Sequence, residues 1–127
     1  MKEQLGWTTL EQSKKLVEAG LDPNTADMFY TSLNMHKTPW VWNSKPFLHP
    51  ADVPCWSLGR LIELMPESVN WRKLVITKPY IAYVNLEEWV YSGHSYFEAC
   101  DDTLIENAVA TICWLLENNY IKKREMK

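Results

Sequence analysis

The sequence predicts an α+β fold, in which a small antiparallel meander of about three strands packs against a long C-terminal helix, with two or three short N-terminal helices. Three observations support this class. Short helical patterns with capping residues occupy the first half of the chain, β-branched and aromatic residues dominate 72–92, and an apolar stripe with helical spacing runs through 104–116. Because 127 residues is about the length of one domain, we expect one globular domain over 1–121 and a polar tail over 122–127.

A helical pattern begins near the N-terminus. Thr8 and Glu11 have the spacing of a capping box, and Gly20 can take the left-handed conformation that ends a helix, so a first helix is expected between them. Asp22-Pro23 then provides an N-cap and a proline in the first turn, and apolar residues recur behind it at helical spacing. This pattern predicts a second short helix over about 23–34.

The segment from Met35 to Cys55 breaks the helical pattern. It contains four of the seven prolines, which interrupt a helix and remove hydrogen-bond donors from a central strand. Its aromatic residues make it too apolar for disorder, so we expect an ordered irregular loop that packs onto the body of the domain. Ser57 then caps a third short helix, which ends before Pro66.

Residues after Trp71 favour β-structure. Their apolar side chains alternate with polar or opposite-face neighbours, which predicts strands at 72–77, 80–85 and 88–92. Lys78-Pro79 supplies the first break between them. Because the connections are short, consecutive strands should pair antiparallel and form the meander.

The last helix is the strongest element. Thr103 and Glu106 repeat the capping-box spacing, and Asp101 and Asp102 place negative charge where a helix N-terminus favours it. Asn118-Asn119 supplies a left-handed end. The face expected to enter the core consists of Leu104, Ile105, Ala108, Val109, Ile112, Leu115 and Leu116.

Charge and composition disfavour several classes of function. The formal net charge of −3, from 13 basic and 16 acidic residues, disfavours nucleic-acid binding, which needs a basic face. The longest apolar stretch is too short for a membrane span and contains Glu106, so no membrane association is expected. Three cysteines without a C-x-x-C pair favour reduced thiols and a cytoplasmic protein.

No catalytic or metal-binding constellation stands out. The possible metal ligands are too widely spaced to predict a site: His36, His49, Cys55 and His94. The neighbourhood of His94, Cys100 and Asp102 gathers the residue types of nucleophilic catalysis, but helix capping explains the acids and a turn explains the histidine. We therefore predict no cofactor and favour a non-enzymatic protein over a small enzyme that uses these three residues.

The aromatic, proline-rich loop over about 35–56 is the candidate binding surface. Its rings and one cation are Trp40, Trp42, Lys45, Phe47 and Trp56. Tryptophan is a frequent anchor of protein interfaces, so we predict that this loop binds another protein. Two interpretations stay open beside it: the rings form a small core under the loop, or Trp40 and Trp42 stack a sugar or a single-stranded nucleic acid. Homo-oligomerisation also stays open.

Three stretches of the sequence resemble known proteins. Residues 56–66 (WSLGRLIELMP), 108–121 with their core CWLLENNYI, and 21–28 (LDPNTADM) are similar to small uncharacterised proteins of gut Bacteroides-type bacteria and their prophages. The resemblance implies a bacterial or phage origin and an accessory protein. It carries no activity, cofactor or catalytic residue that could be transferred to this chain.

Overall fold

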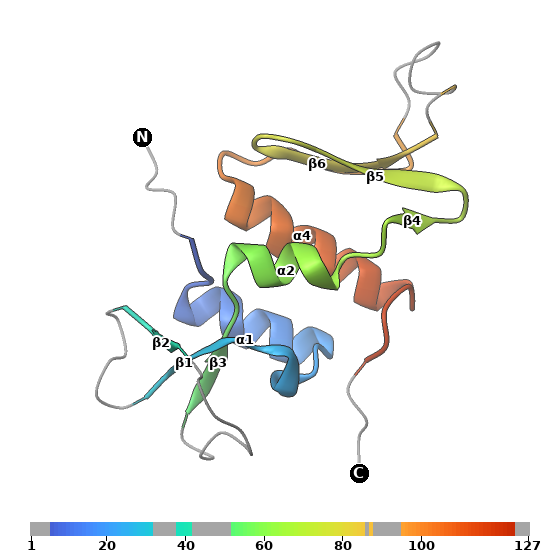
Figure 1. Cartoon of the computed structure of the whole chain (residues 1–127). Coiled ribbons are helices and arrows are strands. Elements are labelled where there is room, and N and C mark those ends of the chain that lie inside the picture. The colour runs from blue at the N-terminus through green and yellow to red at the C-terminus, as the bar shows by residue number, and fades with distance from the viewer. Residues whose placement is uncertain (1–5, 32–37, 42–51, 86, 88–94, 124–127) are drawn as a thin grey trace.

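The computed structural model describes residues 6–31, 38–41, 52–85, 87 and 95–123, which form helices and two antiparallel sheets (Figure 1). The α+β class and the long C-terminal helix are therefore confirmed. The helical elements are α1 (Leu10–Ala19), the short 3-10 helix η1 (Pro23–Thr25), α2 (Leu58–Leu64) and α4 (Leu104–Glu117). The strands are β1 (Met28–Tyr30), β2 (Trp40–Val41), β3 (Val53–Cys55), β4 (Ser68–Val69), β5 (Arg72–Thr77), β6 (Tyr80–Val84) and β7 (Phe97–Ala99).

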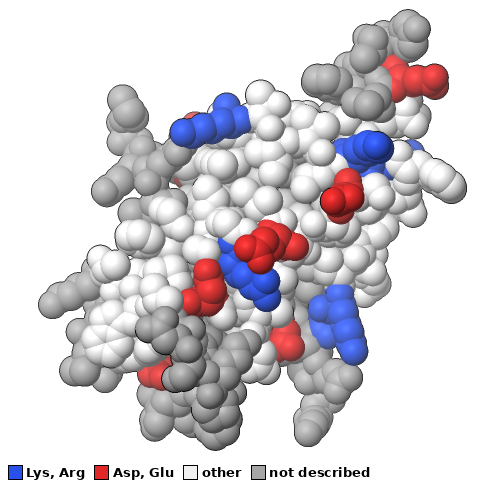
Figure 2. Space-filling model, in the orientation of Figure 1, with Lys and Arg blue, Asp and Glu red and all other residues white. Residues whose placement is uncertain are grey.

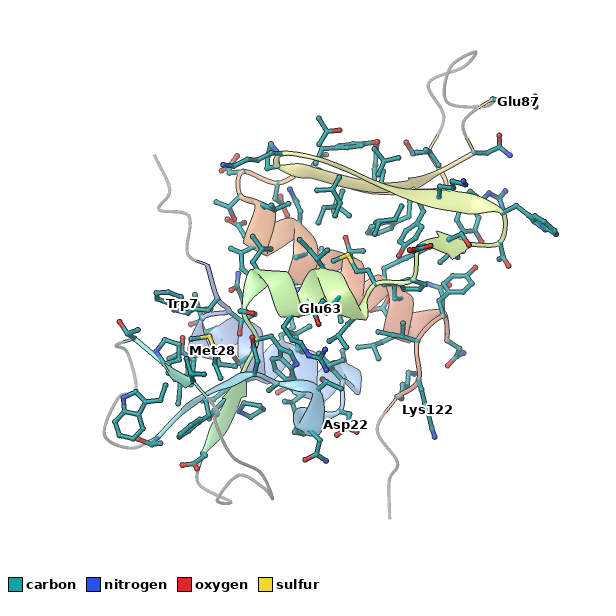
Figure 3. The ribbon with its side chains drawn as sticks, in the orientation of Figure 1. Trp7, Asp22, Met28, Glu63, Glu87 and Lys122 are labelled. Atoms are coloured by element: carbon teal, nitrogen blue, oxygen red, sulfur yellow. The ribbon has the colours of Figure 1, made fainter. Side chains whose placement is uncertain are left out.

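The helices lie between the two sheets. Figure 1 shows the four-stranded sheet β4-β5-β6-β7 above α4 and α2, and the three-stranded sheet β2-β1-β3 beside α1. Helix α4 contacts α1, α2, β6 and β7, so it lies at the centre of this arrangement. Side chains from the helices and from both sheets fill the space between the layers (Figure 3). The apolar core is one cluster that joins α1, α2, α4 and the four-stranded sheet.

Helix α4 is buried on most of its surface. The Thr103 hydroxyl oxygen accepts the backbone N–H of Glu106 at 3.2 Å and donates to the Glu106 carboxylate at 3.0 Å, so the N-cap is where the sequence places it. None of the helices in the described ranges is long and apolar enough to cross a membrane. The buried residues of α4 are Ile105, Asn107, Ala108, Val109, Thr111, Ile112, Cys113, Leu115 and Leu116.

The chain leaves α4 as the sequence predicts. Asn119 has a φ of 60°, which is the left-handed conformation expected after the last turn. Lys122 and Lys123 are exposed, while the rest of the predicted tail, 124–127, lies outside the described residues. The side chain of Lys123 lies against Gly20, where an added Cβ atom would come within 3.1 Å of its Cγ atom.

The four-stranded sheet corrects part of the predicted meander. Strands β5 and β6 occupy the predicted places of the first two strands, but the third place is taken by β7. The predicted third strand, 88–92, lies outside the described residues. Phe97 in β7 is opposite Tyr83, and its ring stacks on Trp114 of α4 at 4.4 Å between ring centroids. This stacking gives β7 an apolar contact with α4 that the strand's own short sequence does not indicate.

The predicted helix over 23–34 is wrong. Asp22 accepts the backbone N–H of Asn24 at 3.0 Å and Pro23 follows it, but they begin only the short helix η1. Strand β1 follows instead, with Tyr30 opposite Val53 in β3. Because β1 is the central strand and pairs with both β2 and β3, long-range pairing outweighs the helical spacing of its apolar residues.

The expectation of an irregular segment over 35–55 also needs correction. Its described parts contain β2 and β3, while 42–51 lie outside the described residues. Pro54 sits within β3, opposite Phe29 of β1. Strand β3 is at an edge of its sheet, where a proline is tolerated although it lacks an N–H group.

The start of α1 is shifted by one residue from the predicted capping box. Thr9 is the N-cap, and its hydroxyl accepts the N–H of Gln12 while the Gln12 side chain accepts the N–H of Thr9. Thr8 cannot serve as the cap because its hydroxyl is engaged in the core. It lies 2.8 Å from the Ser13 hydroxyl and accepts the N–H of Trp56 at 3.1 Å.

The other predicted helix ends are confirmed. Gly20 has a φ of 108° and closes α1, and the N–H of Leu21 returns to the carbonyl of Leu16 at 3.0 Å. Ser57 caps α2 through its side chain, and the helix ends before Pro66.

Replacing Ile112 by Asp should lower the free energy of unfolding by several kcal/mol, because the change places an unpaired charge on the fully buried face of α4. Lys14→Asp is the matched control, since it introduces the same side chain at an exposed position of α1. Denaturant unfolding followed by circular dichroism measures both. Equal midpoints for Ile112→Asp and the unmodified protein would contradict the packing of α4.

Thiol labelling of the native protein should find one fast cysteine and two slow ones. Cys100 is exposed, whereas Cys55 and Cys113 are buried. Burial raises the pKa of both buried thiols, which also lowers their reactive thiolate fraction. A disulfide-exchange reagent under metal-free conditions measures the three rates, and Cys100→Ser should remove the fast phase. Rapid modification of Cys113 in the folded protein would contradict this description.

Candidate functional site

The structure separates the residues of the predicted aromatic surface. Trp40 and Val41 are 47% and 61% exposed on β2, and the Trp40 ring meets Phe29 edge-on at 5.9 Å. Trp56, by contrast, is 0% exposed, so its assignment to a binding surface is wrong. Trp42, Lys45 and Phe47 lie outside the described residues. The described part of the loop therefore contributes one exposed ring to the surface and one ring to the core.

Trp56 is buried because several segments meet around it. Its backbone N–H donates to the Thr8 hydroxyl at 3.1 Å. Its backbone carbonyl accepts the N–H of Thr8 at 2.9 Å. Its indole N–H donates to the hydroxyl of Thr25 at 3.0 Å. The next residue, Ser57, donates its backbone N–H at 2.8 Å and its hydroxyl to the Asp27 carboxylate. With its polar group satisfied and its ring enclosed, Trp56 holds the N-terminal segment, η1 and the start of α2 together.

The suggested catalytic neighbourhood is described only in part. Cys100 and Asp102 are both exposed, and His94 lies outside the described residues. The neighbouring Asp101 donates its backbone N–H to the Asn107 side chain at 2.6 Å, which fixes the entry into α4. Among the residues that the structure describes, no group of three or more His, Cys, Asp or Glu side chains could hold a metal ion.

The most exposed aromatic residue of the described chain lies at the β4–β5 turn. Asn70 and Trp71 form a two-residue loop between Val69 and Arg72, and their φ angles are 45° and 69°. Positive φ at both loop residues is the mark of the type I′ hairpin, in which the second position favours glycine. Here that position holds a tryptophan that is 93% exposed. A bulky residue in the left-handed region costs about 1–2 kcal/mol, and the exposed ring recovers little of that through packing.

A network of polar and ring contacts fixes this turn. The Arg72 guanidinium donates through Nη1 to the Asn70 carbonyl at 2.9 Å and lies 4.1 Å from the centre of the Tyr96 ring. The Asn70 side chain donates to the Tyr120 hydroxyl at 2.8 Å, and the Tyr120 and Tyr96 hydroxyls are 2.9 Å apart. We call Asn70, Trp71, Arg72, Tyr96 and Tyr120 the turn surface. Its members come from three separate parts of the chain.

Trp114 of α4 supports the turn surface from below. Its ring meets Tyr96 edge-on at 5.8 Å and Tyr120 in a tilted contact at 5.3 Å. The Trp114 ring also contacts two rings of the four-stranded sheet, with centroid distances of 4.4 Å to Phe97 and 5.8 Å to Tyr83. The β4–β5 turn and the C-terminal end of α4 lie on the same side of the molecule (Figure 1). Packed rings have few alternative rotamers, so this support holds the exposed groups in place.

The electrostatics of the turn surface centre on Arg72. Its Nε atom is buried without a hydrogen-bond partner, and no carboxylate pairs with it among the residues that the structure describes. The hydrogen bond with Tyr120, followed by Asn70 and the Arg72 charge, lowers the pKa of the Tyr96 hydroxyl. The same hydrogen bond raises the pKa of Tyr120. Arg72 is therefore a cation held over the Tyr96 ring, with its buried Nε donor left unsatisfied.

Basic and acidic side chains are mixed on the face of the molecule that Figure 2 draws. Figure 2 shows basic and acidic side chains interspersed over a mostly uncharged face. This face has no extended region of one sign, which agrees with the small net charge of −3. Recognition at the turn surface therefore depends on its own groups, because long-range attraction toward a polyanion needs a larger basic field.

Sequence reasoning missed the turn surface for two reasons. Tryptophan is not a turn former, so Asn70-Trp71 lacks the usual hairpin signature, and only the asparagine hints at a left-handed residue. Tyr96 and Tyr120 reach the turn only through the packing of β7 and α4.

Trp71→Gly should raise the free energy of unfolding by about 0.5–1 kcal/mol, because glycine adopts positive φ without strain and little packing is lost. The greater freedom of glycine in the unfolded chain limits the gain. Lys73→Gly is the control: it lies in the extended strand β5 and should lower stability by about 1 kcal/mol. Thermal and denaturant melts compare the variants. A destabilised Trp71→Gly protein would show that the ring packs against the fold.

Comparison with known proteins identifies no relative of this chain. No protein-family model, curated protein or solved structure matches the chain.

Proposed function

We propose that this chain is a non-enzymatic interaction protein that binds another protein through the turn surface, with Trp71 as the anchor. The observation that carries the proposal is a tryptophan that is 93% exposed at a backbone φ of 69°. A smaller residue would fit this loop with less strain and less exposed apolar area. Backbone strain that packing does not offset is expected where the ring has another role, such as contact with a partner.

The composition and rigidity of the turn surface support this role. Tryptophan, tyrosine and arginine are the residue types that dominate the binding energy of protein interfaces. Arg72, Asn70 and the two tyrosines are already linked by hydrogen bonds and a ring contact, so binding would freeze few additional side chains. A surface organised before its partner arrives loses less entropy on binding.

The shape of the anchor favours a pocket on the partner. The ring stands at the tip of a hairpin, so the partner must supply the concave side of the contact. Enclosing a tryptophan removes about 150–250 Å² of surface from water, which contributes about 4–6 kcal/mol before the costs of association. Micromolar binding needs about 8 kcal/mol after those costs, so the surrounding groups of the turn surface must contribute as well.

The aromatic loop provides a second candidate surface for the same function. Trp40 and Val41 are exposed on β2, which is an edge strand of the three-stranded sheet. Exposed edges accept an extended segment of another protein as an additional strand. This surface keeps the sequence-based hypothesis of a binding loop, in which Trp40 remains a candidate contact and the buried Trp56 does not.

The sequence resemblance supports a proposal about the origin of the protein and its role as an accessory protein. We propose a bacterial or phage origin and an accessory role, because residues 21–28, 56–66 and 108–121 resemble small proteins of such genomes. An accessory protein acts through association with other molecules, which agrees with an exposed, preorganised anchor.

A displayed library of random dodecapeptides, selected on the immobilised protein, tests the proposal. Binding of the recovered peptides should fall at least about tenfold with Trp71→Gly, because the anchor is gone from a protein that remains folded. Trp40→Ala is the matched control on the other aromatic surface and should change binding by less than about twofold. Peptides that depend on Trp40 alone would move the function to the loop. Peptides that bind both variants equally would overturn the proposal.

A further inference from the structure

We infer that the turn surface recognises an acidic segment, in which a carboxylate pairs with Arg72 beside the apolar group that contacts Trp71. This inference rests on the proposed function and names the chemistry of the partner. It begins with the guanidinium of Arg72, which has five N–H donors. The described contacts use one of them, from Nη1 to the Asn70 carbonyl. Nε is buried without a partner, so the donors that a second molecule can reach are the remaining N–H groups of the two terminal nitrogens.

The orientation of Arg72 suits a carboxylate. Its guanidinium lies over the Tyr96 ring at 4.1 Å from the centroid, and the bond to Asn70 fixes its rotation. A planar guanidinium held in this way presents paired donors, which match the two oxygens of a carboxylate. Within the described residues the contacts of Arg72 are with the Asn70 carbonyl and the Tyr96 ring, and no carboxylate pairs with it. The inference assigns the pairing carboxylate to another molecule.

The local charge of the hairpin points the same way. Residues 68–79 contain Arg72, Lys73 and Lys78 and no acidic residue, whereas the whole chain has a net charge of −3. Charges act over about 8–10 Å at physiological salt, so a short acidic segment experiences the hairpin more than the rest of the protein. A nucleic acid or an anionic bilayer extends much further and meets the negative charge of the whole molecule.

The neighbouring groups complete the specificity of the site. Trp71 precedes Arg72 in the turn and exposes its apolar ring, and the Tyr96 and Tyr120 hydroxyls add hydrogen-bonding atoms beside Asn70 and Arg72. A segment that places an acidic residue next to a large apolar residue satisfies both parts. An apolar segment without an acid would leave Arg72 with its donors unmatched.

The peptides recovered with the displayed library test this inference. Those that depend on Trp71 should share an Asp or Glu close to an apolar residue. Changing that acid to Asn or Gln in a synthetic peptide should raise the Kd about tenfold in calorimetric titration. The Kd should also rise as salt increases from about 0.05 to about 0.5 M. These changes are made in the peptide or the buffer, so they leave the folded protein intact.

Protein variants separate pairing with Arg72 from general attraction. Arg72→Lys keeps the charge but removes the planar donors, so it should weaken the acidic peptide severalfold and leave its Asn or Gln version unchanged. Lys78→Gln, at the far end of β5, is the control and should have little effect. Equal losses for Arg72→Lys and Lys78→Gln would overturn the inference, because they would indicate only the overall charge of the hairpin.

Two further outcomes distinguish the inference from the proposed function. Peptides that depend on Trp71 but contain no acid, with a Kd independent of salt, would overturn the acidic partner and leave the interaction protein standing. An absence of peptides that depend on Trp71 would overturn both. Trp71-dependent binding to phosphatidylglycerol vesicles or to oligothymidylate, at concentrations where the acidic peptide does not bind, would assign the surface to a lipid or nucleic-acid partner and overturn the inference.

Discussion

The burial of α4 is the constraint on which the rest of the structure depends. Nine of its 14 residues are buried, and the helix contacts α1, α2, β6 and β7. A polar residue fixes its depth: the Asn107 side chain donates to the carbonyls of Pro79 and Asp101, at 2.7 and 3.2 Å, and accepts the N–H of Asp101 at 2.6 Å. Any slide of the helix would leave the buried Asn107 amide unsatisfied, so one position of α4 is strongly preferred.

The same helix supports the exposed surface that we assign to binding. Its last turns provide Trp114, and the chain then continues to Tyr120, which accepts a hydrogen bond from Asn70. The rings behind the β4–β5 turn are thus anchored in the core, while Trp71 is 93% exposed. A rigid support with one free apolar group is the arrangement expected of an interface anchor, because the support loses little entropy when a partner binds.

Two polar clusters of this protein differ in a way that separates structural from functional roles. Around Thr8 the polar groups satisfy one another. Tyr30 donates to the Thr8 carbonyl at 2.8 Å, the backbone N–H of Trp56 donates to the Thr8 hydroxyl, and the Ser13 hydroxyl lies 2.8 Å from the Thr8 hydroxyl. Burial raises the pKa of Cys55 in this cluster, which keeps the thiol neutral and inert. The turn surface instead leaves the terminal N–H groups of Arg72, apart from the one bound to the Asn70 carbonyl, without an acceptor among the described residues, and the neighbouring Trp71 is exposed. Unmatched groups at a surface are the ones that a second molecule can complete.

The sequence by itself determined the elements whose signals are local. Capping residues and periodicity involve neighbours within a few positions of the chain. They predict the C-terminal end of α1 at Gly20, helix α2 between Ser57 and Pro66, strands β5 and β6, and most of α4. Only the tertiary structure decided the rest. Strand β1 replaces a predicted helix because two other strands pair with it, and Trp56 is buried because Thr8 and Thr25 bind it from 48 and 31 positions away. The turn surface likewise needs Asn70 and Tyr120, separated by 50 positions, to meet. Such contacts depend on how the elements pack, and no pattern of adjacent residues encodes that packing.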